Sequence, residues 1–398
     1  MQILSASWVV PVAAPPLAGG RVAVNDGRVQ WVGRAGAAGQ PEGEVVDLGD
    51  GVLLPGLVNA HCHLELSHLA GAVDTSRGFV SWVEEVVEKR LVTDEKDVRA
   101  GARRGISQLE STGTVGVGDV SNALKHLDLL EESSLRAVVF HELLSWDPGK
   151  SMLLLAASDK IAQLSKGQRM RTQVRVAAHA PHSVSPPLMK GIIERGGPFA
   201  IHLAESPVET EFLNTGGGEW AAFLGRRGAG RVKFTPPGLS PTRYLDSVGA
   251  LRSGMVAAHC VHCDAADRAL LAERGVFAVM CPRSNAALGV GTADVPALME
   301  AGVKLALGTD SLAGVETLDL LAEAAALQRA FPSLDPAAIV RMATLGGAEA
   351  LGFKDLGTIA PGKRAALAFA PGGSDITDPL AFLTSGHAQA RPAIPAHP

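Results

Sequence analysis

The stretch VLLPGLVNAHCH, residues 52–63, is an apolar run that ends in two histidines separated by one residue. Further apolar runs follow it, and segments with helical character separate each run from the next. In chain order the eight runs are VLLPGLVNA, TVGVGDV, RAVVFHELL, VRVAAHA, FAIHLA, MVAAHCV, VFAVMC and VKLALGT. Apolar strands that are each followed by a crossover helix are typical of a parallel sheet. Eight of them predict a closed (β/α)8 barrel of the TIM type.

The helical segments between the runs have recognisable beginnings. Proline follows two of the starting residues directly, as is common in the first turn of a helix. Four polar residues are expected as N-caps: Thr93, Ser185, Asp264 and Asp335. The regular alternation of strand and helix places the protein in the α/β class.

The two ends of the chain differ from the barrel region. Residues 1–54 alternate apolar and polar positions around turn signals, as in RVAVNDGRVQWVG, where the Asn-Asp-Gly stretch suits a tight hairpin. After about residue 356 the segment GTIAPGKRAALAFAPGG returns to strands and turns. We therefore predict a small β-sandwich-like domain from residues 1–54 and 357–398, and a barrel domain from residues 55–356.

Composition restricts the kinds of partner. With 46% hydrophobic and 19% charged residues the chain is globular, and a net charge of −5 offers no electrostatic footprint for nucleic acid. The apolar N-terminus has no basic leading segment and contains Pro11, Pro15 and Pro16, so we expect no membrane span. Four cysteines in 398 residues do not suggest a disulfide scaffold. We expect a cytoplasmic protein with free thiols that acts on a small molecule, and a homo-oligomer remains open.

Polar residues collect at the predicted C-terminal strand ends, where barrels of this type carry their reactive groups. His61 and His63 close the first strand. Because strand side chains alternate, both can face the barrel mouth while Cys62 faces away. Four more polar residues lie at or just after the ends of the fifth, sixth and eighth strands: His202, Glu205, His259 and Asp310. One buried histidine alone is more often a core residue than a ligand, but this many polar groups at strand ends indicate a site.

Other motifs carry less weight. Cys260 and Cys263 have the spacing of a zinc pair, but there is no second pair, and strand alternation turns Cys260 outward. We therefore expect packing thiols. The sequence elements of the cytidine-type zinc deaminases are absent. The glycines at 113–118 lack the register of a dinucleotide site, and GGGEW (216–220) is expected to be a flexible insertion.

Seven stretches form a recognisable series along the chain: PGLVNAHCHLE (55–65), HAPHSVSP (179–186), HLAES (202–206), AHCVH (258–262), PRSNAALG (282–289), LGTDS (307–311) and TLGGAEALG (344–352). In this order they resemble the amidohydrolase superfamily, in particular its branch of adenosine-type deaminases and chlorohydrolases. The resemblance covers nearly the whole chain. It implies a metal-dependent hydrolase that removes an amino group from a small heterocycle.

In that branch one metal ion is held by the His-x-His pair, the histidine of the fifth strand and the aspartate of the eighth. The resemblance therefore implies four ligands: His61, His63, His202 and Asp310. It also implies three catalytic groups: Glu205, His259 and Asp310. Three imidazoles and one carboxylate suit zinc, although iron or manganese fits the same ligands. We expect one divalent transition metal per chain.

The expected reaction is hydrolysis at an amino-bearing ring carbon. The metal would lower the pKa of a bound water toward about 7, and the resulting hydroxide would attack that carbon. His259 would orient the hydroxide and Asp310 would accept its proton. Glu205 would carry a proton to the ring nitrogen, and ammonia would then leave.

A narrower resemblance concerns the substrate. The stretch HCHLELS (61–67) is similar to the aminodeoxyfutalosine deaminases of menaquinone biosynthesis. It implies 6-aminodeoxyfutalosine, an adenine-like nucleoside that carries a benzoate. Glu65 and His179 are expected to bind substrate at the rim of the barrel. Arg77 and Arg90 are candidates for the carboxylate, but a surface arginine is more often solvated, so the predicted site does not include them.

Several alternatives remain open. A binuclear amidase of this superfamily needs a carboxylated lysine at the end of the fourth strand, where this chain has VAAHAPH without lysine. Deaminases of S-adenosylhomocysteine, adenosine or guanine, chlorohydrolases and iminohydrolases share the same core. His182 stands where the family often has tyrosine, which concerns the shape of the pocket. A metal-free binding protein with the same barrel is the alternative from another class, and metal analysis distinguishes it.

Overall fold

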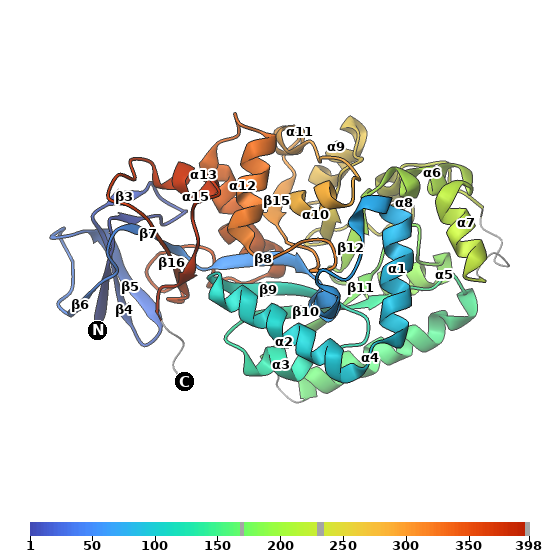
Figure 1. Cartoon of the computed structure of the whole chain (residues 1–398), viewed down its shortest axis with the longest axis horizontal. Coiled ribbons are helices and arrows are strands. Elements are labelled where there is room, and N and C mark those ends of the chain that lie inside the picture. The colour runs from blue at the N-terminus through green and yellow to red at the C-terminus, as the bar shows by residue number, and fades with distance from the viewer. Residues whose placement is uncertain (168–170, 229–234, 395–398) are drawn as a thin grey trace.

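The protein is described here by a computed structural model that covers residues 1–167, 171–228 and 235–394 (Figure 1). Its centre is a sheet of eight parallel strands, hydrogen-bonded in chain order. They are β8 (Leu57–Cys62), β9 (Thr114–Ser121), β10 (Arg136–Leu143), β11 (Gln173–Ala178), β12 (Ala200–Leu203), β13 (Val256–His259), β14 (Phe277–Met280) and β15 (Lys304–Leu307). A parallel bridge between Cys62 and Asp310 links the end of β8 to the segment after β15. The sheet is thus nearly closed into a barrel, which confirms the predicted (β/α)8 fold.

The first apolar run is divided between two sheets. Its first half forms β7 (Gly51–Pro55), which belongs to a small sheet outside the barrel, and only β8 enters the barrel. Gly56 separates the two strands, and a Cβ there would lie 2.3 Å from a methyl group of Val115. The first apolar run is therefore not one continuous strand, because the backbone at Gly56 lies too close to Val115 for a side chain.

Helices surround the barrel (Figure 1). The α-helices are α1 (Phe79–Val92), α2 (Glu95–Ser111), α3 (Leu127–Glu132), α4 (Ser151–Gly167), α5 (Pro186–Glu194), α6 (Pro207–Thr215), α7 (Gly218–Arg226), α8 (Pro241–Ser247), α9 (Ala265–Glu273), α10 (Pro282–Ala287), α11 (Val295–Glu300), α12 (Leu320–Ala330), α13 (Pro336–Arg341), α14 (Gly347–Leu351) and α15 (Pro379–Thr384). Shorter turns are η1 (Leu64–Leu69), η2 (Thr75–Arg77), η3 (Pro148–Lys150) and the π-helical η5 (Met342–Gly346). No helix in these described ranges is long and apolar enough to cross a membrane.

Three of the four predicted N-caps are confirmed, namely Ser185 for α5, Asp264 for α9 and Asp335 for α13. Thr93 is wrong by one residue, since Asp94 occupies the N-cap position of α2, without a side-chain hydrogen bond to the helix. The Thr93 hydroxyl instead donates to the carbonyl of Lys89 at 2.7 Å and so belongs to the end of α1.

Apolar side chains fill the barrel and close one end of it. Val58, Val120 and Val279 pack inside with Leu351 and Phe353 from the region around α14. Burial of each such side chain contributes roughly 1.5–3 kcal/mol. The α14 segment packs against the beginning of β8. The opposite rim, where the strands end, is therefore left for the polar residues.

Two small sheets lie beside the barrel, and the N-terminal strand belongs to one of them (Figure 1). One sheet has the order β5-β4-β1-β6 and the other β17-β16-β7-β2-β3. The strands are β1 (Gln2–Ser5), β2 (Trp8–Val9), β3 (Leu17–Ala18), β4 (Gly20–Asn25), β5 (Arg28–Arg34), β6 (Glu44–Asp47), β7, β16 (Leu367–Pro371) and β17 (Arg391–Pro392). Asp26 and Gly27 form the tight hairpin between β4 and β5, both with positive φ. C-terminal β16 pairs with N-terminal β7, whereas the domain limits at 54 and 357 stay a prediction.

Candidate active site

Four predicted metal ligands converge at the C-terminal rim of the barrel. His61 lies in β8 and His63 follows it directly. His202 lies in β12, and Asp310 follows β15. The Nε2 atoms of His63 and His202 are 3.1 Å apart, and Asp310 Oδ1 lies 3.6 Å from His63 Nε2 and 3.8 Å from His61 Nε2. The four donors therefore surround one small volume.

This arrangement fits a divalent metal. Ligands at 2.0–2.1 Å in a tetrahedron are separated by about 3.3 Å, close to the separations between these donors. His61 Nε2 is buried and has no hydrogen-bond partner among the described residues. A buried polar atom without a partner is costly, and a cation at this point would satisfy it together with the other three donors.

Neighbouring groups orient the ligands. His202 Nδ1 donates to the carbonyl oxygen of His179 at 2.8 Å, which leaves the Nε2 lone pair free to face the site. Ser284 Oγ donates to Asp310 Oδ2 at 2.5 Å and fixes the carboxylate. Burial, followed by the neighbouring histidines, holds the pKa values of His61 and His202 well below the ordinary range. The two imidazoles are therefore neutral, as metal ligands must be.

Two buried side chains hold the turn after His63 in place. Asp119 in β9 is fully buried and accepts from the backbone N–H of Leu64 at 2.8 Å. Its second oxygen lies 2.7 Å from His126 Nε2. This buried pair fixes the chain at the point where the second ligand leaves the strand.

Glu205 and His259 lie beside the ligands. His259 Nδ1 donates to Asn285 Oδ1 at 2.8 Å, so its Nε2 faces the site, 3.7 Å from Glu205 Oε1. Burial raises the pKa of Glu205 to about 7, a value suited to a group that exchanges protons at neutral pH. Burial opposes a charge on His259, but Glu205 and Asp310 outweigh it and raise the pKa of this histidine. The Glu205 backbone N–H donates to Glu209 Oε2 at 2.9 Å, which fixes the start of the following loop.

The backbone is strained at these strand ends. Ala204, His259, Cys260 and Asp310 all have positive φ, between 49° and 72°. Residues other than glycine rarely adopt this conformation, and such strain concentrates at functional sites. Cys260 and Cys263 are buried in the apolar cluster outside the strands, which confirms that they pack as thiols.

A cavity of about 270 Å³ opens from three of the predicted metal ligands, His63, His202 and Asp310. One wall is apolar and comes mainly from α1 and α7: Phe79, Trp82, Val86, Trp146, Trp220 and Phe223. The other wall is polar: Glu65, Arg90, Asn122, Glu142, His179 and Ser183. The cavity therefore suits a ligand that is polar on one side and carries an apolar group.

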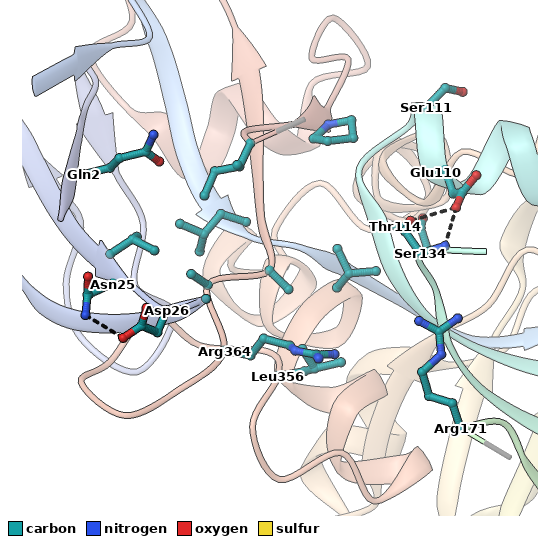
Figure 2. A pocket seen from close by; sticks show the side chains of 18 of the residues that line it. Gln2, Asn25, Asp26, Glu110, Ser111, Thr114, Ser134, Arg171, Leu356 and Arg364 are labelled. Atoms are coloured by element: carbon teal, nitrogen blue, oxygen red, sulfur yellow. Dashed lines mark hydrogen bonds between the residues drawn. The ribbon is translucent and has the colours of Figure 1, made fainter. Parts of the chain in front are cut away.

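A larger cavity, of about 950 Å³, lies between the small sheets and the barrel (Figure 2). Its labelled polar side chains pair largely with one another or with the backbone. Glu110 accepts from the Ser134 backbone N–H and hydroxyl at 2.7 Å each, and Asn25 donates to Asp26 at 2.8 Å. None of the predicted site residues lines it. Volume alone therefore does not locate the active site.

Glu65 lines the active-site cavity, but its carboxylate already has partners within the protein. It accepts from Arg90 at 2.6 Å, from the Ala123 backbone N–H at 3.0 Å and from the Ser121 hydroxyl. Burial acts to raise the pKa of Glu65, but Arg90 and the two other donors lower it below the ordinary value. Arg90, omitted from the predicted site, thus lies in the cavity. Arg77 is exposed and pairs with Glu85 at 3.0 Å.

His179 and His182 differ in their surroundings. His179 lines the cavity, and its Nδ1 lies 2.6 Å from the Ser183 hydroxyl. Burial lowers the pKa of His179 to about 3, which keeps this imidazole neutral. His182 is buried behind the apolar wall, where its ring contacts Trp220 with centroids 4.4 Å apart. The presence of histidine here, where the family often has tyrosine, therefore affects the shape of that wall.

Sequence reasoning missed several cavity residues. Glu142 and Asn122 follow the same strand-end rule as the ligands, so the glutamate within RAVVFHELL was a signal that could have been used. Trp220 lies in the stretch 216–220, for which the prediction of a flexible insertion is wrong. Gly216 and Gly217 instead form the tight turn between α6 and α7, and Trp220 is buried. The assigned ligand, catalytic and substrate-binding roles remain predictions, although all these residues line or adjoin one cavity.

Comparison with known proteins gives the family. The model of the amidohydrolase family matches residues 52–390, most of the chain. The chain belongs to the amidohydrolase family. A 5-methylthioadenosine/S-adenosylhomocysteine deaminase from Moorella thermoacetica is 32% identical over 381 residues, which cover 90% of this chain and 83% of the relative. An aminodeoxyfutalosine deaminase from Deinococcus radiodurans is 34% identical over 322 residues, covering 76% of this chain and 73% of the relative.

A solved structure agrees with the fold. An adenosine deaminase from Xanthomonas campestris with bound zinc has a TM-score of 0.81 at 25% identity, covering 98% of this chain and 90% of that chain. This amidohydrolase is a hydrolytic deaminase, and its histidine cluster is that of a metal-dependent enzyme. The alternative of a metal-free binding protein is therefore rejected.

Proposed function

We propose that this deaminase removes the ring amino group of an adenine-type nucleoside, with 6-aminodeoxyfutalosine of menaquinone biosynthesis as the substrate. The observation that carries the proposal is the convergence of four ligand donors beside the Glu205–His259 pair, at the end of a cavity with one polar and one apolar wall. We place the enzyme in the cytoplasm, with no nucleic-acid or membrane partner.

Zinc is the proposed metal. His61, His63, His202 and Asp310 would hold it, and three imidazoles with one carboxylate are a common zinc set. The similar adenosine deaminase from Xanthomonas campestris contains zinc, while iron or manganese would accept the same ligands. When bound, such an ion supplies a water molecule whose pKa is lowered toward about 7.

Three residues of the chain then orient the water and transfer protons. His259 Nε2, fixed by the Asn285 bond on its other nitrogen, orients the attacking water. Asp310 Oδ1 accepts a proton from that water, while Ser284 holds the other carboxylate oxygen in place. Glu205, with a pKa of about 7, gives a proton to the ring nitrogen so that negative charge does not accumulate there. The proton taken up by Asp310 then passes to the amino group, which leaves as ammonia, and the hydroxyl group on the ring carbon returns a proton to Glu205 as the carbonyl forms.

The choice of substrate is supported by the relatives and by the cavity. The relatives named above act, by their names, on 5-methylthioadenosine or S-adenosylhomocysteine in one case and on aminodeoxyfutalosine in the other. These compounds share an adenine ring on a sugar. Trp82, Trp220 and Phe223 form an aromatic surface on which the benzoate ring of 6-aminodeoxyfutalosine would stack.

Ammonia release from metal-loaded protein tests the proposal. We expect the highest kcat/KM for 6-aminodeoxyfutalosine. Adenosine, 5-methylthioadenosine and S-adenosylhomocysteine should be slower, because they keep the reacting ring and lose remote binding energy. Preference for guanine, cytosine or a chlorotriazine would show that the substrate is wrong. No reaction with any of these compounds would refute the proposed activity.

A further inference from the structure

Glu142 is a buried acid in the cavity to which none of the preceding steps gives a role. It lies near the end of β10 with only 6% of its surface exposed. Its Oε2 accepts from Asn122 Nδ2 at 2.8 Å, whereas Oε1 has no hydrogen-bond partner among the described residues. A buried carboxyl oxygen without a partner costs free energy, so a donor from within the cavity would satisfy it.

The nearest protein group does not provide that donor. His202 Nδ1 lies 3.6 Å from Glu142 Oε1, but its single proton is already donated to the carbonyl of His179 at 2.8 Å. The other nitrogen of His202 faces the ligand cluster. Glu142 therefore does not orient the metal ligand through a hydrogen bond, and its free oxygen is available to a bound molecule.

The position of Glu142 on the rim indicates which part of the substrate it meets. Glu205 follows β12 and His259 ends β13, and both are assigned to the reacting ring, whereas Glu142 and Asn122 belong to β10 and to the loop after β9. Because one cavity joins both sides, a ring held by Glu205 and His259 would place its substituent near Glu142 and Asn122. On that second side Glu65 and Arg90 already pair with each other.

We propose that Glu142 Oε1 accepts a hydrogen bond from a sugar hydroxyl of the nucleoside and so selects substrates with a hydroxylated sugar. This inference rests on the proposed function. Asn122 is the positioning residue, because its amide donates both to the carboxyl group and to the backbone carbonyl of Glu142, at 2.8 and 3.0 Å. With one oxygen fixed in this way, the other oxygen has a defined direction.

The test compares two substrates that differ only in the sugar. The kcat/KM for adenosine and for 2′,3′-dideoxyadenosine is measured with metal-loaded wild type, Glu142→Ala and Glu142→Gln. We expect the wild type to prefer adenosine by roughly 10- to 100-fold, the effect of leaving a buried hydrogen-bonding group without its partner. In Glu142→Ala the preference should fall below about 3-fold, with metal content unchanged.

Glu142→Gln keeps the volume and protects the test against a folding defect. Because Asn122 donates to this side chain, the glutamine should turn its oxygen toward Asn122 and its NH2 toward the cavity, which removes the acceptor. Asn122→Ala should reduce the preference less than Glu142→Ala does. Glu323→Gln changes a buried acid that does not line the cavity, and it should keep the wild-type preference.

Binding of inhibitors gives a second reading that does not depend on turnover. Calorimetry should show that the wild type binds coformycin more tightly than 2′-deoxycoformycin, and that Glu142→Ala reduces this difference. Equal losses for both members of each pair would overturn the proposal and give Glu142 a structural role. If the wild type neither deaminates nor binds any of these compounds, the proposed function fails, and this inference fails with it.

Discussion

Replacing Glu205 by glutamine tests directly whether this residue transfers a proton in the reaction. The substitution keeps size and shape and removes only the ability to give up a proton. The Glu205 backbone N–H would still donate to Glu209, and no metal ligand would change. We therefore expect metal content near the wild-type value.

The size of the effect follows from the position of the carboxyl group. Glu205 is buried, lies 3.7 Å from His259 Nε2 and has a pKa raised to about 7 by burial. A positioned acid or base of this kind accelerates a reaction by roughly 10²- to 10⁴-fold, or about 3–5 kcal/mol of barrier. Turnover of Glu205→Gln should fall within this range.

The assay is ammonia release at saturating substrate, together with elemental analysis of the same samples. In the wild type kcat/KM should decline as pH rises above about 7, because the protonated form of Glu205 is then lost. The residual activity of the variant should lack this decline. Turnover within 3-fold of wild type, with metal retained, would refute the assigned role. Loss of metal would show that Glu205 supports the ligands instead.

Three further predictions concern metal, pH and pocket shape. Elemental analysis should find about one transition metal per chain, and Asp310→Ala should lose both metal and activity; two metals at full occupancy would favour a binuclear enzyme. Burial raises the pKa of Glu323 to about 8, so the stability that it contributes is present below about pH 4.5 and lost as pH rises toward 8. Thermal unfolding should therefore show a higher Tm for Glu323→Gln than for wild type at pH 8 and a much smaller gain at pH 5, and equal gains would contradict this account. Trp220→Ala should raise KM for 6-aminodeoxyfutalosine by roughly 10-fold or more and change KM for adenosine little, since the aromatic wall would contact only the distal group; steady-state kinetics on both substrates decides it.

The barrel could be predicted from the sequence because its signals are local. Each strand is a short apolar run, and the ligands stand at the ends of such runs, where the fold itself brings them together. His61, His202 and Asp310 are far apart in sequence, yet each lies at or just after a strand end. The same rule applied to Glu142 would have found it, since its strand was already identified.

The apolar wall could not be predicted in this way. Trp82 and Trp220 reach the cavity from α1 and α7, and the position of these helices depends on the turns that precede them. The turn before α7 consists of glycines, whose conformation a pattern of apolar residues does not report. The error at Thr93 has a similar origin, because its hydroxyl bonds backward to α1 rather than forward to α2.

The two sides of the rim are therefore assigned different functions: one side binds the metal and transfers protons, and the other side selects the substrate. The proposed metal ligands and proton carriers come mainly from β8 and from β12 to β15, where strained residues such as His259 and Asp310 place their side chains. Glu142 and the aromatic wall come from β10, α1 and α7, and make none of the contacts between the ligand donors. A substitution on this second side changes which nucleoside fits without moving the metal. For that reason the identity of the substrate has to be argued from the aromatic wall and its neighbours, and not from the two histidines that the family shares.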